Sequence, residues 1–310
     1  MFAIVAHGGA GRWGQGVEEA AAAVGSAAAA GGRLLATGAT ALDAVTLAVA
    51  SMEDSPLLNA GTGSALTLEG RAEMDAGVMT GHDLAAGGVG GLERVRSPVQ
   101  VARRVLSGTD HVLLTGPGAL RFARSQGFTD HDPVTPASRQ RWRRLREKLG
   151  TESPALLPRL PGLLQHHPEL GGDTVGAVAL DRGGHLAAAT STGGIMLRLP
   201  GRVGDSPLPG AGNFADANCA VSATGLGELM MRQGTARMVA AAVAAGSDPG
   251  AAARSTLDDL AARLGSECGL IALDRQGQWA VDHRTPALPA AVFQAGDTHP
   301  RLGADRDSLG

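Results

Sequence analysis

The chain of 310 residues contains no tyrosine, and aromatic residues make up only 3% of it. Proteins that bind single-stranded nucleic acid stack bases on aromatic side chains, so this composition disfavours a nucleic-acid platform. The chain also has little excess charge of either sign, because 27 basic and 30 acidic residues leave a net charge of −3. Such a balance indicates neither a polyanionic partner nor an anionic membrane surface.

Cysteine, long apolar runs and metal-binding motifs are scarce as well. The two cysteines, Cys219 and Cys268, are too few for a disulfide framework or a cysteine zinc cluster. A single disulfide between them is compatible with the sequence. No apolar run reaches the roughly 18 residues of a membrane span, and the N-terminus lacks the basic and apolar regions of a signal peptide. The nine histidines show no H-E-x-x-H spacing. We expect a cytoplasmic globular protein with no membrane partner.

Glycine, by contrast, is abundant, with 46 residues, and hydrophobic residues make up 44% of the chain. The glycines follow no G-x-y period, so they indicate tight turns and close backbone approaches rather than collagen. Both halves of the chain alternate strand-like and helix-like segments. This pattern predicts a layered α/β protein with helices outside packed sheets.

Local patterns predict most of the elements. Thr40 and Asp43 form a capping box ahead of one helix, and Ser97-Pro98 begins another that runs through Val105. Strands are predicted over residues 2–6, 64–68, 73–79, 111–114, 175–180, 186–192 and 218–223, with a hairpin over 269–281 and further helices over 118–125, 228–245 and 248–264.

Residues 129–172 differ from the rest because six prolines surround a basic stretch from Arg139 to Lys148. We interpret this segment as a mobile linker, part of which can form a solvated helix. The basic stretch fits a solvated surface better than a nucleic-acid contact, given the acidic overall balance.

The segment Gly171-Gly-Asp-Thr-Val-Gly176 places a threonine at the head of an apolar strand, directly after this linker. Thr174 has two interpretations: an ordinary strand residue after a Gly-Gly loop, or an N-terminal nucleophile released by cleavage of the Asp173–Thr174 bond. A threonine hydroxyl is a weak nucleophile, and the free α-amine of the same residue, with a pKa of about 7.7–8.0, can act as its base. An internal threonine has no such amine, so the second interpretation requires cleavage.

Two further loops carry polar groups suited to a small ligand. Arg202 and Asp205 lie three residues apart on a loop constrained by Gly and Pro, where they form either a local surface ion pair or a clamp for an amino-acid headgroup. Thr224 begins a Gly-rich strand–helix turn, which is either an ordinary connection or an anion or oxyanion site.

Taken together, these segments resemble the isoaspartyl peptidase / plant-type L-asparaginase family of N-terminal nucleophile hydrolases. The resemblance covers nearly the whole chain except the linker. It rests on His7-Gly-Gly-Ala-Gly11, Asn59-Ala-Gly61, Met74-Asp-Ala76, Asp173-Thr-Val-Gly-Ala-Val-Ala-Leu-Asp181, Thr190-Ser-Thr-Gly-Gly194, Pro200-Gly-Arg-Val-Gly-Asp-Ser-Pro207 and Thr224-Gly-Leu-Gly-Glu228.

The resemblance implies a four-layer αββα sandwich, one domain over residues 1–310. The precursor would cleave itself before Thr174 into an α subunit, 1–173, and a β subunit, 174–310, and two αβ units would form a dimer. The nucleophile would be Thr174, with its own amine as base. Thr192 would orient and help to activate it, and Asn59 would support that network.

The resemblance also implies the substrate site. Thr224 Oγ and the Gly225 N–H would form the oxyanion hole, and both residues would also line the substrate pocket. Arg202 and Asp205 would hold the α-carboxylate and α-amine of the substrate, with Gly227 lining the same pocket.

In such relatives a loop of backbone carbonyls holds a structural sodium ion. The matching carbonyls here are those of Met52, Glu53, Ser55, Leu58, Ala60 and Thr62. No cofactor is expected to be required. The implied activity is the hydrolysis of β-aspartyl (isoaspartyl) dipeptides and of L-asparagine, the latter to L-aspartate and ammonia. The alternatives are a glycosylasparaginase-type amidase and a non-catalytic metabolite-binding protein that never matures.

Overall fold

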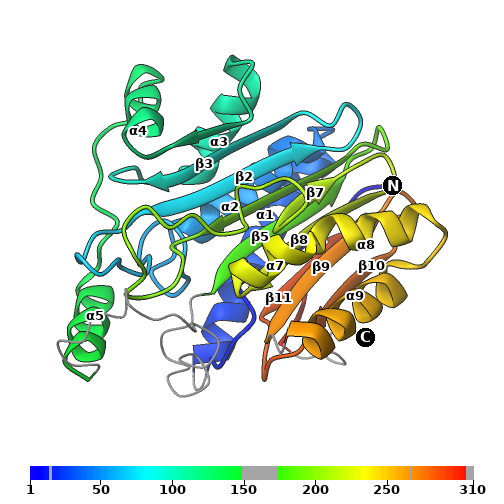
Figure 1. Ribbon diagram of the computed structural model, residues 1–310. Coiled ribbons are helices and arrows are strands. Elements are labelled where there is room, and N and C mark those ends of the chain that lie inside the picture. The colour runs from blue at the N-terminus through cyan, green and yellow to red at the C-terminus, as the bar shows by residue number, and fades with distance from the viewer. Residues whose placement is uncertain (14–15, 149–172, 265–266, 305–310) are drawn as a thin grey trace.

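The computed structural model describes residues 1–13, 16–148, 173–264 and 267–304. Its strands form two stacked sheets, and helices cover both outer faces (Figure 1). The described helices are α1 (Val17–Ala36), α2 (Ala41–Glu53), α3 (Pro98–Gly108), α4 (Gly116–Ser125), α5 (Pro136–Lys148), α7 (Gly227–Gln233), α8 (Thr235–Ala244) and α9 (Pro249–Leu264). The described strands are β1 (Ala3–His7), β2 (Met74–Thr80), β3 (Ala86–Leu92), β4 (Leu113–Thr115), β5 (Thr174–Leu180), β6 (Leu186–Thr192), β7 (Asn213–Ala215), β8 (Cys219–Gly225), β9 (Cys268–Asp274), β10 (Trp279–His283), β11 (Ala290–Gln294) and β12 (Arg301–Gly303).

The larger sheet has eight strands in the order β12-β11-β1-β5-β6-β2-β3-β4, and the smaller has four in the order β10-β9-β8-β7. In Figure 1, α8 and α9 lie in front of the smaller sheet, and α1 and α2 lie behind the larger one. The four layers confirm the expected αββα sandwich.

Strand periodicity decides which side chains face the gap between the sheets. In β5, Val175, Ala177 and Ala179 belong to the core beneath α1 and α2, whereas Val178 and Leu180 belong to the core between the sheets. Because successive side chains point to opposite faces, Thr174 shares the second face. The first residue of this buried strand is thus aimed at the smaller sheet.

Several predicted elements are confirmed. The Thr40 hydroxyl accepts the backbone N–H of Asp43, and the Asp43 carboxylate accepts that of Thr40, which completes the capping box of α2. The hairpins β5–β6 and β9–β10 both pair antiparallel. Cys219 and Cys268 are both buried free thiols, so no disulfide joins them. In the described part of the chain, no helix combines the length and apolarity that crossing a bilayer requires.

Other predictions are wrong. Residues 64–68 form no strand, because their backbone pairs with irregular segments and side chains: the Leu68 N–H donates to the Arg198 carbonyl, and the Leu66 carbonyl accepts the Leu197 N–H. The Asn59 amide oxygen accepts the Ala65 N–H, and Trp142 Nε1 donates to the Thr67 carbonyl. The helix predicted over 228–245 is two helices, since Gly234 adopts a left-handed φ of 70° between them. The strand predicted over 111–114 is β4, shifted toward the C-terminus, and α3 extends past Val105 to Gly108.

The helix allowed for within the predicted linker is present, but it is packed against the protein rather than fully solvated. Residues 136–148 form α5, which packs the buried Leu145 and the partly buried Trp142 into a small core with Leu66. Two α5 arginines donate to carbonyls of the 68–70 turn, which fastens the helix to the body of the protein. Residues 149–172 lie outside the described part of the chain. The strands β3, β7, β11 and β12 were not predicted.

Candidate active site

Three polar residues form a row across the centre of the larger sheet. Thr174 pairs directly with Thr192, and Thr192 pairs with Asp75 on its other side. Directly paired residues point to the same face, so all three side chains enter the gap between the sheets. Each is less than 5% exposed. The sheet register therefore brings together residues that are far apart in the sequence.

The Thr192 hydroxyl has all of its hydrogen-bonding capacity occupied. It accepts from Thr174 Oγ1 at 3.2 Å and from the Gly194 N–H at 2.9 Å, and it donates to the Asp173 carbonyl oxygen at 3.1 Å. A hydroxyl has one donor and two acceptor sites, so nothing is left over. The Thr174 proton is thereby directed at Thr192, and the lone pairs of the Thr174 oxygen are left for other contacts.

Asn59 also contacts the bond expected to be cleaved. Its Nδ2 donates to the Asp173 carbonyl at 2.7 Å and to the Gly194 carbonyl at 2.8 Å, and its Oδ1 accepts from the Ala65 N–H at 2.7 Å. The carbonyl that precedes Thr174 thus accepts two hydrogen bonds, one from Asn59 and one from Thr192. This is the geometry of an oxyanion-stabilising pair.

The loop after β1 joins the Thr174 end of β5 to Thr224 at the end of β8. A Cβ on Gly9, whose φ is +111°, would lie 2.8 Å from the Thr174 nitrogen. The next residue, Ala10, donates its N–H to Thr224 Oγ1 at 3.2 Å. Thr224 is fully buried and precedes Gly225 at the end of the strand. The close approach at Gly9 explains why glycine stands there.

The substrate clamp expected at Arg202 and Asp205 is assembled around a glycine. A Cβ on Gly227 would lie 2.6 Å from Asp205 Oδ1 and 3.0 Å from Arg202 Nη2, so a side chain there would fall between the two charged groups. Asp205 Oδ2 is buried and has no hydrogen-bond partner in the described structure. Burial raises the pKa of Asp205 to about 7, against the opposing charge of Arg202. An oxygen of this kind is suited to a cationic ligand.

Arg202 has a partner that the sequence did not reveal. Its Nε and Nη2 donate to the two carboxylate oxygens of Glu228 at 2.9 and 3.0 Å. Partial burial alone would raise the pKa of Glu228, but the Arg202 hydrogen bonds and charge bring it below the usual value. In the sequence, Glu228 resembles any acidic residue in the first turn of a helix. Its bidentate pairing instead fixes the orientation of the guanidinium.

Asp75 was also not predicted from the sequence as a site residue. It links the loop that carries Arg202 and Asp205 to the row formed by Thr174, Thr192 and Asp75. Its carboxylate accepts the Gly204 N–H and the Gly91 N–H, both at 2.8 Å. Burial raises the pKa of Asp75, opposed chiefly by the Gly204 hydrogen bond. The Met74-Asp-Ala76 motif was the signal that could have found it. The clamp loop is thereby anchored one strand away from Thr192.

The carbonyl loop expected to hold sodium closes on itself. The Thr62 N–H donates to the Glu53 carbonyl at 2.7 Å, and the Ser55 N–H donates to the Met52 carbonyl at 3.1 Å. The Glu53 side chain turns inward, accepting from Ser191 Oγ at 2.6 Å and from the Val99 N–H at 2.9 Å. Burial raises the pKa of Glu53 to about 7. Within the residues described, no cluster of three or more His, Cys, Asp or Glu side chains is suited to a metal ion.

A buried threonine at the head of a central strand, facing a second sheet in an αββα sandwich, defines the class of N-terminal nucleophile hydrolases. Comparison with known proteins gives the family. A family model described as Asparaginase matches residues 1–301, and the chain belongs to this family of hydrolases, which act on small-molecule substrates.

Three relatives illustrate the match. The chain is 41% identical to the plant-type L-asparaginase of Pyrococcus abyssi over 98% of this chain and 100% of that protein. It is 42% identical to the isoaspartyl peptidase of Escherichia coli over 89% of this chain and 86% of that protein. It is 37% identical to the isoaspartyl peptidase/L-asparaginase of Danio rerio over 96% and 93% of the two chains.

Proposed function

We propose that this protein is a self-processing threonine hydrolase that cleaves β-aspartyl dipeptides and deamidates L-asparagine. The observation that carries the proposal is the contact between Thr174 Oγ1 and Thr192 Oγ1 beside a carbonyl held by two donors. The names of the relatives supply the substrate classes. The clamp of Arg202 and Asp205 supports a substrate with a free aspartyl headgroup.

Maturation begins when Thr174 Oγ attacks the Asp173 carbonyl carbon. Negative charge develops on the carbonyl oxygen, which already accepts from Asn59 Nδ2 and Thr192 Oγ1. The C–N bond then breaks, the nitrogen takes up the hydroxyl proton, and an ester links Asp173 to the threonine oxygen. Water hydrolyses this ester and leaves residue 173 with a carboxylate and Thr174 with a free hydroxyl and a free amine.

The new α-amine is the base for turnover. It takes the proton of the Thr174 hydroxyl as the oxygen attacks the side-chain carbonyl of the substrate. The oxyanion is bound by Thr224 Oγ and the Gly225 N–H. Thr224 already accepts from Ala10, which leaves its own proton for this bond. The amine, now protonated, gives its proton to the departing nitrogen, and water hydrolyses the aspartyl ester.

The headgroup determines which substrates bind. The α-carboxylate pairs with Arg202, and the α-ammonium contacts the Asp205 carboxylate, whose Oδ1 lies beside Gly227. The space beside Gly227 admits this headgroup between the two charges. L-Asparagine and β-aspartyl dipeptides present the same headgroup and differ only in the leaving amine.

The loop over residues 52–62 is proposed to bind sodium. Its neutral carbonyl oxygens suit a hard cation, and the Glu53–Thr62 hydrogen bond brings its two ends together. The carbonyls of Met52, Glu53, Ser55, Leu58, Ala60 and Thr62 would be the ligands. The melting temperature should be higher in sodium chloride than in choline chloride of equal ionic strength; equal values would exclude a structural role for the ion.

The experiment that tests the proposed function is Thr174→Ala. Wild-type protein should resolve into two fragments on a denaturing gel, the smaller beginning Thr-Val-Gly-Ala, and should release L-aspartate from both substrate classes. The variant should remain one inactive chain, because attack and turnover use the same hydroxyl. A wild-type chain that stays intact for days would favour a non-catalytic binding protein, and preference for N-acetylglucosaminyl-asparagine would favour a glycosylasparaginase. Sedimentation of the mature protein as a dimer of αβ units is expected.

A further inference from the structure

The rim of the candidate site carries an ion pair that the proposed function does not use. Arg12 follows the glycine loop directly, and its Nη2 lies 2.9 Å from Glu267 Oε1. Both side chains are more than half exposed. The pair connects two segments that contact the site, the loop at residues 8–11 and the residue before β9.

The two segments that this ion pair joins each approach a residue of the proposed reaction, Thr174 in one case and Gly225 in the other. On the Arg12 side, a Cβ on Gly9 would lie 2.8 Å from the Thr174 nitrogen. On the Glu267 side, its carbonyl oxygen is 3.0 Å from the position that a Cβ on Gly225 would take. The ion pair therefore joins the end of a loop that borders the nucleophile at Gly9 to the residue whose carbonyl borders the proposed oxyanion hole at Gly225.

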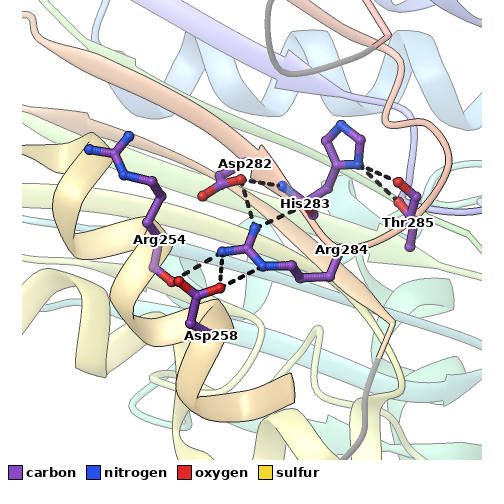
Figure 2. A network of polar contacts seen from close by, with 6 residues as sticks. All are labelled: Arg254, Asp258, Asp282, His283, Arg284 and Thr285. Carbon is purple, nitrogen blue, oxygen red and sulfur yellow. Dashed lines mark hydrogen bonds and ion pairs between the residues drawn. The ribbon is translucent and has the colours of Figure 1, made fainter. Parts of the chain in front are cut away.

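The Glu267 side of the rim is firmly anchored. The Arg284 backbone N–H donates to the carbonyl of Cys268, the residue after Glu267. Figure 2 shows the Arg284 guanidinium between Asp258 on α9 and Asp282 on β10, with Nη1 at 2.9 Å from Asp282 Oδ1. This network connects β10, α9 and the start of β9. The Arg12 side is held by Trp13, whose Nε1 donates to the Gly9 carbonyl at 2.9 Å.

The proposed mechanism indicates that the leaving group lies on the same side of the site as the loop that precedes Arg12. The departing nitrogen must lie within reach of the Thr174 amine, which gives it a proton. Gly9 borders the Thr174 nitrogen, and from this we infer that the leaving group extends along the loop at residues 8–11. In the uncleaved chain the Asp173 side chain already lies along this strip, with Oδ1 2.6 Å from the position of a Cβ on Gly11. The strip therefore has room for a carboxyl group, although burial raises the pKa of Asp173 there to about 7, against the opposing charge of Arg141.

We propose that Arg12 binds the α-carboxylate of the amino acid that leaves when a β-aspartyl dipeptide is hydrolysed. The inference rests on the proposed function, and it makes dipeptides, rather than L-asparagine, the substrates that use the rim. An exposed ion pair contributes little to stability, so the substrate carboxylate can replace Glu267 at the guanidinium at small cost. L-Asparagine releases ammonia, which has no carboxylate, and gains nothing from Arg12.

The test compares three substrates: β-aspartyl-leucine, β-aspartyl-leucinamide and L-asparagine. The first two differ only in the terminal charge. Arg12→Gln should lower kcat/KM for β-aspartyl-leucine about 10-fold, the effect of losing one charge-assisted contact, and leave the other two within about 2-fold. Glu267→Gln should improve β-aspartyl-leucine selectively, because it removes the competing carboxylate. Arg182→Gln, an exposed arginine at the opposite end of β5, is the matched control and should change none of the three.

Equal losses on all three substrates would assign Arg12 a structural role and overturn the proposal. Unchanged hydrolysis of β-aspartyl-leucine by Arg12→Gln would also overturn it. So would a loss that Arg141→Gln shows for β-aspartyl-leucine alone, because the Arg141 charge also acts on the Asp173 carboxyl and Arg141 would then be the residue that binds the substrate carboxylate. A measurement without variants guards against misfolding: the wild-type preference for the acid over the amide should shrink toward one as salt rises to about 0.5 M. Wild-type turnover of L-asparagine tests the proposed function separately.

Discussion

Thr192→Val is the most informative perturbation of the proposed maturation step. Valine keeps the shape of threonine and removes only the hydroxyl. The substitution deletes the 3.1 Å hydrogen bond to the Asp173 carbonyl and leaves the second donor, Asn59 Nδ2 at 2.7 Å, in place. The scissile carbonyl then has one donor where charge develops, instead of two.

The size of the effect follows from these contacts. Losing one oxyanion donor typically slows a reaction about 10²–10³-fold, so the half-time of self-cleavage should lengthen by that factor. The buried Gly194 N–H also loses its acceptor, which should cost about 1–3 kcal/mol of unfolding free energy. Maturation and stability therefore fall together, and the assay must separate them.

Thr190→Val provides the separation. Thr190 lies two residues earlier on the same face of β6, is fully buried, and bonds Ser222 Oγ at 2.8 Å rather than Asp173. The Thr190→Val variant should lose about as much unfolding free energy, measured in urea, as Thr192→Val does, while maturing at nearly the wild-type rate. The assay is the appearance of the fragment beginning at Thr174, followed on denaturing gels over days. Maturation of Thr192→Val at the wild-type rate, or equal slowing in both variants, would refute the role assigned to the Thr192 hydroxyl.

Three further outcomes are expected. Thr224→Val should mature normally but lose about 10²–10³ in kcat with little change in KM, because its hydroxyl is proposed to donate to the oxyanion of turnover and has no hydrogen bond to the Asp173 carbonyl in the described structure; steady-state kinetics would contradict this if KM alone rose. Arg202→Lys should raise KM and lower kcat/KM while sparing maturation, since lysine keeps the charge but loses the bidentate fork, and equal wild-type turnover of N-acetylated and free β-aspartyl dipeptides would argue against the clamp. The raised pKa of Glu53, about 7 against an ordinary 4.5, favours the protonated form in the fold, so its contribution to stability is complete below pH 4.5 and is lost as pH rises through about 7. Unfolding of Glu53→Gln should lack this part of the pH dependence, and an identical pH profile in the variant and the wild type would show that Glu53 is not its source.

Local sequence was sufficient to locate the strand that begins at Thr174 and to predict the layered α/β class. A short apolar run, a preceding Gly-Gly pair and a capping box are short-range signals that do not depend on tertiary context. The motifs at Arg202, Asp205 and Thr224 are also short-range signals, and the roles assigned to these residues remain predictions.

The structure alone revealed the contacts between these motifs. Asn59 reaches the Asp173 carbonyl across 114 residues of sequence, and Asp75 accepts from Gly204 across 129. Such contacts depend on sheet register, and a shift of one residue would turn Thr192 and Asp75 to the opposite face. The pairing of Glu228 with Arg202 was hidden because an acidic residue in the first turn of a helix has an ordinary explanation in sequence.

The errors in the fold have the same origin. Residues 64–68 have strand-like composition, but their backbone pairs with the irregular segment at Leu197 and Arg198 and with the side chains of Asn59 and Trp142, which only the packed structure places beside them. The basic stretch, interpreted as a solvated surface that could form a helix, forms α5, and Leu145 packs into a small core that the sequence did not reveal. Sequence by itself supplied the candidate residues for the proposed chemistry and the faces that they occupy on their own strands. Tertiary structure decided which of them meet, because strand register and long-range packing depend on segments that no local pattern connects.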